Sequence, residues 1–270
     1  GTYEFYLQVA DAIDTVQSAT ATVRVAAPLQ VTTSPQSASV YATSPSFDLS
    51  ADYSGGLGTI HYTWYSRNTN TVGFTSQATG TTTGGPITIA VDPAALGTGT
   101  FEYYVTFTDD IGSVDSATAT INVGSPLGIV SSPASTHKYV TSPSFSLSAT
   151  YSGGVGAVNY TWFARNVNDL NPTAVSSGTA ASTTLTLSVD PGALGVGDFE
   201  YYVQLTDTLS SDQSGIATVY VGSPLVITLT TPGLVSDGQG GFLLAAVAHH
   251  PLTQSATVTG GLGTPPYQWE

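Results

Sequence analysis

Apolar and polar residues alternate along much of the chain in short runs. In the stretch FDLSA, for example, Phe47, Leu49 and Ala51 alternate with polar neighbours. A period of two places every second side chain on the same face, which is typical of a strand with one face buried. Turn residues such as the SGG at 54–56 separate these runs. No stretch repeats its apolar residues at helical spacing, so the pattern predicts an all-β protein.

The chain repeats itself at a fixed interval. Trp64 and Trp162 stand 98 positions apart. They belong to a phrase that occurs as SGGLGTIHYTWYSRN at 54–68, as SGGVGAVNYTWFARN at 152–166 and, in altered form, as TGGLGTPPYQWE at 259–270. A second phrase keeps the same interval and begins at Gly1, Gly99 and Gly197. A repeat of this length has the size of a whole domain, so we expect a series of domains and not a solenoid.

Each repeat divides into about seven predicted strands. In the first complete repeat the clearest runs read SFDLSADYS, IHYTWYS, PITIAV, FEYYVTFTD and SATATINV, with turn residues between them. The segment DPAALG predicts one short helical turn, with Asp92 as its N-cap and Pro93 in its first turn. Short strands at close and regular spacing predict a β-sandwich.

These repeats resemble the immunoglobulin-like and PKD-like repeats of bacterial and archaeal surface proteins. In immunoglobulin folds a Trp on the third strand packs over two cysteines that join the sheets. Trp64 and Trp162 match that Trp. Aliphatic residues match the cysteines, with Leu49 and Leu147 at the first position and Val105 and Val203 at the second. The resemblance therefore implies that aliphatic packing under the indole replaces the disulfide.

The resemblance also implies a tyrosine two residues before the second cysteine position, whose hydroxyl bonds to nearby backbone. Tyr103 and Tyr201 match it, whereas Phe5 in the first copy has no hydroxyl. The likeness covers the whole chain, and all of its motifs are structural. It implies tandem immunoglobulin-like β-sandwiches and carries no activity.

The repeat frame predicts four parts. The end of one domain lies at 1–26, complete domains lie at 27–124 and 125–222, and the start of another lies at 223–270. A few small residues and a proline connect them, and proline restrains the backbone, so we expect a semi-rigid rod. Neither partial domain matches residues 65–98. We therefore expect the polypeptide to continue, and the alternative is that a neighbouring chain supplies the missing strands.

Charge and composition exclude several classes of partner. The net charge is −14, because four basic residues face eighteen acidic ones. Nucleic acid and anionic membrane surfaces both need clustered Lys and Arg, so neither is an expected partner. No apolar run approaches the roughly 18 residues of a membrane span. The chain has no cysteine, which excludes a disulfide scaffold and thiol chemistry but not an extracellular location. Its hydroxyl-rich polar residues are common on secreted and cell-surface repeat proteins, so we expect an extracellular location at the cell surface.

A group of aspartates near the end of the sixth strand is the candidate metal site. Asp109 recurs as Asp11 and Asp207, and in the second part of the chain it has Asp110 and Asp115 as neighbours. Calcium takes six to eight oxygen ligands, often from several carboxylates, so these three residues form a candidate calcium site. The alternative is that each recurring Asp caps a hairpin turn with its own side chain, since the two neighbours do not recur.

Other candidate sites have simpler explanations. Asn159 begins an N-glycosylation sequon, NYT, that the other repeat lacks. Arg67 and Glu102, repeated as Arg165 and Glu200, predict a cross-strand ion pair or a contact with another subunit. Tyr104 and Tyr202 predict one exposed tyrosine per repeat, for lateral packing or for sugar binding. His249 and His250 are a weak candidate for metal and a better one for a contact loop.

These observations favour a structural protein over an enzyme. A serine nucleophile needs a base, and none of the four histidines recurs between repeats. No catalytic or cofactor-binding residue is predicted. Near-identical domains in series suit self-association into an S-layer or surface filament, by lateral contacts or by strand donation. The alternative is the stalk of a cell-surface adhesin or of a carbohydrate-binding protein, with surface glycans as partners.

Overall fold

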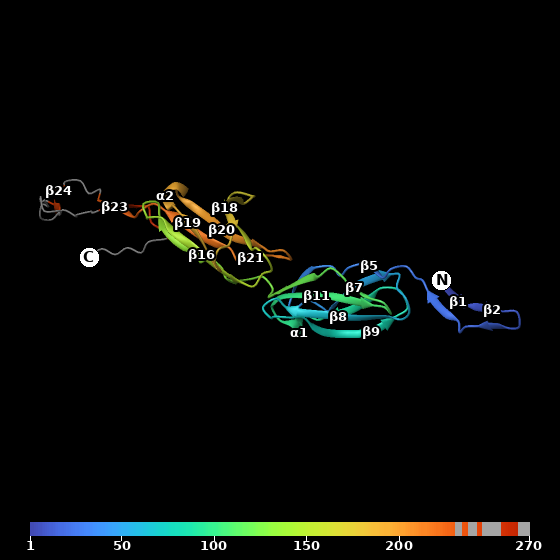
Figure 1. Ribbon diagram of the computed structural model, residues 1–270. Helices are drawn as coiled ribbons and strands as arrows, with labels where there is room; N and C mark the ends of the chain where they lie inside the picture. The colour runs from blue at the N-terminus through green and yellow to red at the C-terminus, as the bar shows by residue number, and fades with distance from the viewer. Residues whose placement is uncertain (230–233, 237–241, 245–254, 264–270) are drawn as a thin grey trace. The chain divides into compact units, whose positions relative to one another are not determined.

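The computed structural model covers residues 1–270 and describes all of them except 230–233, 237–241, 245–254 and 264–270 (Figure 1). The chain divides into two compact units. The first consists of Gly1–Leu127 with Gly153–Gly156, and the second of Gly128–Ser152 with Ala157–Glu270. The bounds of the four predicted parts stay predictions, but each unit contains one complete β-sandwich.

The first complete repeat, 27–124, folds as two sheets. One sheet has the order β10-β7-β5 and consists of β5 (Gln30–Thr33), β7 (Phe47–Ser54) and β10 (Ile87–Val91). The other has the order β6-β13-β11-β8-β9 and consists of β6 (Ala38–Tyr41), β8 (Ile60–Asn68), β9 (Thr75–Thr82), β11 (Gly99–Thr108) and β13 (Ala119–Gly124), with β12 (Ser113–Asp115) on β11. The seven expected strands are present, and the first and last are each split in two. Because β5 and β6 join different sheets, the first strand crosses the sandwich.

The second complete repeat, 125–222, has the same topology. Its sheets have the orders β14-β16-β19 and β15-β22-β20-β17-β18. The strands are β14 (Gly128–Ser131), β15 (Thr136–Tyr139), β16 (Phe145–Ser152), β17 (Asn159–Asn166), β18 (Thr173–Thr179), β19 (Thr184–Val189), β20 (Gly197–Thr206), β21 (Ser211–Gln213) and β22 (Ala217–Gly222). The short helices α1 (Pro93–Leu96) and α2 (Pro191–Leu194) confirm the predicted helical turns, and Asp92 Oδ1 accepts the Ala94 N–H at 3.0 Å as an N-cap.

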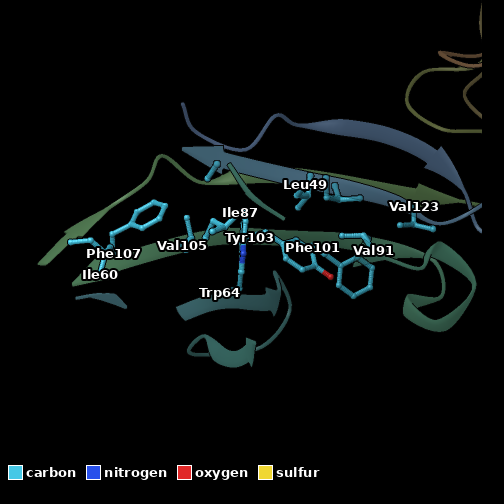
Figure 2. Close-up of a cluster of buried hydrophobic side chains, with 12 residues drawn as sticks. Leu49, Ile60, Trp64, Ile87, Val91, Phe101, Tyr103, Val105, Phe107 and Val123 are labelled. Carbon is cyan, nitrogen blue, oxygen red and sulfur yellow. The ribbon is translucent and has the colours of Figure 1, made fainter. Parts of the chain in front are cut away.

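The core of each sandwich is centred on its tryptophan. Trp64 is 0% exposed and belongs to a cluster of buried side chains that includes Leu49 and Val105 (Figure 2). Val105 lies directly opposite Trp64 on the neighbouring strand. Trp162 is also 0% exposed, and Val203 is its cross-strand partner. Strand alternation thus sends to the core the residues that the immunoglobulin resemblance implied.

The two outer segments of the chain form short antiparallel pairs. Near the N-terminus β1 (Thr2–Phe5) pairs with β4 (Ala21–Arg24), and β2 (Gln8–Ala10) with β3 (Thr15–Gln17). Near the C-terminus β23 (Val226–Leu229) pairs with β26 (Ala256–Thr259), and β24 (Leu234–Ser236) with β25 (Phe242–Leu244). Phe5 is 59% exposed, while its counterpart Tyr103 is 5% exposed. Burial at this position therefore depends on the opposing sheet.

Candidate interaction surface

The outer face of the larger sheet carries the polar and aromatic residues that the sequence singled out. On β8, Trp64 points into the core, so its neighbours Tyr65 and Thr63 point outward. On β11 the same alternation sends Glu102 and Tyr104 outward. The outward residues of the two strands lie opposite one another in the sheet. This face is the main candidate for contacts with other molecules.

An ion pair joins the two central strands of this face in both repeats. Arg67 Nη2 and Nε each lie 2.6 Å from Glu102 Oε2. Arg165 makes the same two contacts with Glu200, at the same distances. These side chains stay about one-fifth to one-third exposed, so each pair contributes at most about 1 kcal/mol to stability. The predicted cross-strand ion pair is confirmed.

Aromatic rings stack beside the ion pair. The Tyr65 and Tyr104 rings lie 5.1 Å apart with an angle of 16° between their planes. The Phe74 ring meets Tyr104 edge-on at 4.8 Å, and the Arg67 guanidinium carbon lies 4.6 Å from the centre of Phe74. In the second repeat Phe163 and Tyr202 stack at 5.0 Å. The expectation of a lone tyrosine is therefore wrong, because neighbouring residues supply further rings.

Sugar binding at Tyr104 and Tyr202 stays a prediction, although other side chains pack against the first of these rings. One face of the Tyr104 ring lies against Tyr65, and Phe74 contacts the same ring. Partial desolvation, helped by the charge of Asp115, raises the pKa of Tyr104 above its ordinary value of 10.0. Packing between side chains accounts for the aromatic group.

Asp109 links two turns. Its Oδ1 accepts hydrogen bonds from the N–H groups of Ile111 at 2.9 Å and Gly112 at 2.8 Å, in the turn between β11 and β12. Its Oδ2 accepts the Leu57 N–H at 2.9 Å, in the turn between β7 and β8. These bonds, that of Ile111 foremost, hold the pKa of Asp109 below its ordinary value of 3.8.

The related aspartates cap the equivalent turns. Asp11 Oδ1 accepts the N–H groups of Ile13 and Asp14, and Asp207 Oδ1 accepts those of Leu209 and Ser210, at 2.7–2.8 Å. The turn-capping interpretation of the recurring aspartate is thus confirmed in all three copies.

The remaining aspartates of the candidate calcium site have other neighbours. Asp110 lies against Gly58, where a Cβ would meet its Oδ2 at 2.1 Å. Asp115 Oδ1 accepts the Thr106 hydroxyl at 2.6 Å on the outer face of the sheet. Among the described residues, no group of three or more His, Cys, Asp or Glu side chains is arranged to hold a metal. Calcium binding by Asp109, Asp110 and Asp115 stays a prediction.

The recurring glycines bind the connector that leads into each repeat. The second glycine of the SGG turn donates its N–H to a connector carbonyl, as in Gly56 to Ala27, Gly154 to Ser125 and Gly261 to Ser223, at 2.8–2.9 Å. The first glycine has a φ of 74° in all three copies. A Cβ on Gly55 would lie 2.0 Å from the carbonyl oxygen of Pro28, so no other residue fits there. The phrase recurs because the turn packs against the connector.

Asn159 is exposed at the start of β17. Its side-chain oxygen accepts a hydrogen bond from the Thr179 hydroxyl at 2.8 Å. An N-linked glycan is attached to the side-chain nitrogen of the asparagine, which this hydrogen bond does not use. Glycosylation at Asn159 stays a prediction. His249 and His250 lie outside the described residues.

The described surface contains shallow hollows. One of them, about 480 Å³, is lined by Tyr53, the SGG turn and residues 58–60 and 82–84, none of them charged, and another lies beside Asp109. No described helix has the length and apolar character needed to cross a membrane.

Comparisons with known proteins agree with the fold. No protein-family model matches the chain, and no curated protein matches its sequence. Among solved structures, an I-band fragment of titin matches with a TM-score of 0.51 and 14% identity, over 87% of this chain and 87% of that fragment. A variant of the same titin domains, with Glu-to-Ala mutations, matches with a TM-score of 0.51 and 14% identity, over 86% of this chain and 87% of its own. This likeness shows tandem immunoglobulin-like domains and leaves their biological source open.

Sequence reasoning missed two of these contacts. The hydrogen bond from Leu57 to Asp109 joins residues 52 positions apart, and the bonds between the glycines and the connectors are also long-range. The available signal was that the glycine pair of the SGG turn occurs unchanged in all three copies of the phrase.

Proposed function

We propose that the chain belongs to a non-catalytic structural protein of the cell surface, whose repeats associate with further copies in an S-layer or a surface filament. The observation that carries this proposal is the recurrence of one outward surface in both complete repeats. The Arg67–Glu102 pair and the stacked rings beside it have equivalents 98 positions later. Domains that present the same surface at regular intervals suit lateral packing.

The partners of the polar side chains support a structural role. The recurring aspartates cap turns, and the two described arginines of the complete repeats are paired with glutamates. The hollow of about 480 Å³ beside the SGG turn is lined by no charged residue. An extracellular location, a semi-rigid rod of domains, binding of calcium and contact with surface glycans belong to this proposal as expectations.

Negative-stain imaging of the purified chain tests the proposal. Sheets or fibres are the expected result, and sedimentation should show large species that grow with concentration. Separate particles at every concentration would instead favour the stalk of an adhesin, in which these domains only hold a binding tip away from the cell. The same measurement with a chelator decides whether calcium takes part, because assemblies that dissolve on chelation depend on the metal.

A further inference from the structure

The sandwich of the first complete repeat has one edge strand that differs from the other three. Its edges are β5, β6, β9 and β10. Three of them are short, with 4, 4 and 5 residues, whereas β9 has 8. An edge strand exposes unpaired backbone N–H and C=O groups, which can pair with another strand. Proteins limit this by making edge strands short or by adding proline and charge.

Proline and charge are also missing from β9. Pro28 and Pro35 flank β5, and Pro86 and Pro93 flank β10. No proline lies between Pro45 and Pro86, so the whole of β9 is free of it. Residues 68–91 contain no charged side chain. Shortness or flanking proline therefore limits pairing at the other edges, whereas β9 has only a register irregularity at Gln77, opposite Trp64 and Tyr65.

The open edge is well ordered along most of its length. The ladder with β8 has one irregularity, near Trp64, and residues 78–82 pair without interruption. Gly80 lies beneath the Tyr62 side chain, where a Cβ would come within 2.6 Å of the hydroxyl oxygen. An aromatic ring over an edge glycine fixes the register of the strand. Thr79 and Thr81 are exposed on its outer face.

Charge decides which partner fits this edge. Two copies of a chain with a net charge of −14 repel each other at most surfaces. An antiparallel pair of identical strands places equivalent residues near one another, and like charges in such a pair are destabilising. The uncharged β9 avoids this cost.

We propose that β9 pairs edge to edge with β9 of a second copy, antiparallel about a two-fold axis. This inference rests on the self-association proposed above and names one of its contacts.

The second repeat has a less open edge at the same place. Its β18 has 7 residues, and it begins directly after Pro172, with Asp169 nearby. We therefore expect β9 to be the stronger pairing edge.

The test uses a double variant of the whole chain, Thr79→Lys with Thr81→Lys. Both positions are exposed, so the variant should fold, which circular dichroism verifies. Lysines at facing positions of the paired edges should weaken dimer formation about tenfold or more in sedimentation equilibrium. Added positive charge lowers the repulsion between two copies of this acidic chain. If net charge alone controlled association, the double variant would therefore form dimers more tightly than the unaltered chain. The two explanations thus predict changes of opposite sign.

The matched control is Asn70→Lys with Val72→Lys. Both residues are exposed in the loop between β8 and β9, so the control adds two lysines to the same repeat outside the β9 edge. It should change the dimer constant by less than about twofold, because it leaves the β9 edge unaltered. If both variants change association equally, or the β9 variant changes nothing, the edge pairing is wrong and self-association still stands. If the unaltered chain stays monomeric at every concentration, both proposals are wrong.

Discussion

The two complete repeats, 27–124 and 125–222, have the same topology and the same structural contacts, although their sequences differ at many positions. Both have the buried Trp, the Arg–Glu pair, the Asp-capped turn and the glycine bond to the connector. The differing pairs that bear on the candidate sites include Ser66 and Ala164, Phe74 and Pro172, Asp110 and Thr208, and Asp115 and Gln213. The contacts that occur in both repeats are those that stabilise the sandwich.

The differences separate structural residues from candidate functional ones. Two of the three predicted calcium ligands, Asp110 and Asp115, are among the positions that change. Any calcium binding would therefore be specific to the first repeat. The third, Asp109, recurs because it caps a turn. Matched substitutions in the two repeats can test each of these assignments.

The largest expected effect is the loss of the tryptophan. Trp64→Ala and Trp162→Ala each remove a fully buried side chain, so each should lower the free energy of unfolding of its repeat by about 3–5 kcal/mol. Urea denaturation followed by circular dichroism measures the loss. Equal costs would support the equivalence of the two cores, and a large cost in only one repeat would contradict it.

A phenylalanine control separates the ring from its polar group. The indole N–H of Trp64 and that of Trp162 have no hydrogen-bond partner in the structure. Trp64→Phe therefore loses packing but no hydrogen bond, and we expect a cost of about 1–2 kcal/mol.

The second prediction concerns the turn that contacts the connector. Gly55→Ala and Gly153→Ala should each cost about 2–3 kcal/mol, because alanine is strained at a φ of 74° and its Cβ would overlap a proline carbonyl oxygen. Gly73 is the control, since its φ is 87° with open space around it, and Gly73→Ala should cost only about 1 kcal/mol. Similar melting temperatures for Gly55→Ala and Gly73→Ala would show that the connector contact contributes little.

Local sequence patterns predicted the fold but not its long-range hydrogen bonds. Alternation identified the buried faces around Leu49 and Trp64, and the Asp-Pro pair at 92–93 identified a helical turn. These features depend on neighbouring residues. The contact of Phe74 with Tyr104 depends instead on how a loop folds over the sheet. The split of the first strand between two sheets likewise follows from the sandwich as a whole.

A smaller difference should distinguish the two core tyrosines. Burial raises the pKa of Tyr103, and a hydrogen bond with Ser66 on the neighbouring strand opposes this shift. The bond from this hydroxyl to nearby backbone that the resemblance implies stays a prediction. Tyr103→Phe should cost about 1 kcal/mol. In the second repeat Ala164 stands where Ser66 does, so Tyr201→Phe should cost less.

A double-mutant cycle sharpens this comparison. Ser66→Ala combined with Tyr103→Phe should cost less than the sum of the single changes, since both remove one interaction. Ala164→Ser should raise the cost of Tyr201→Phe toward the value of the first repeat. Equal costs for the two tyrosines in the unaltered chain would mean that the hydroxyl of Ser66 does not stabilise the fold.

The smallest expected difference appears only in acid. The pKa of Asp109 is lowered in the folded state, so its stabilisation is fully present above the unfolded value of about 3.8 and is lost as the pH falls through the lower folded value. In a chain whose only tryptophan is Trp64, fluorescence-detected urea unfolding should give constant stability above about pH 5 and a decline below about pH 4. Asp109→Asn should lower the free energy of unfolding at neutral pH, because an amide nitrogen in place of Oδ2 cannot accept the Leu57 N–H. It should also flatten the decline in acid, because the variant has no carboxyl group to titrate at this position. Asp115→Asn removes the same charge without touching either turn, so a decline as flat as that of Asp109→Asn would assign the effect to net charge and not to the linked turns.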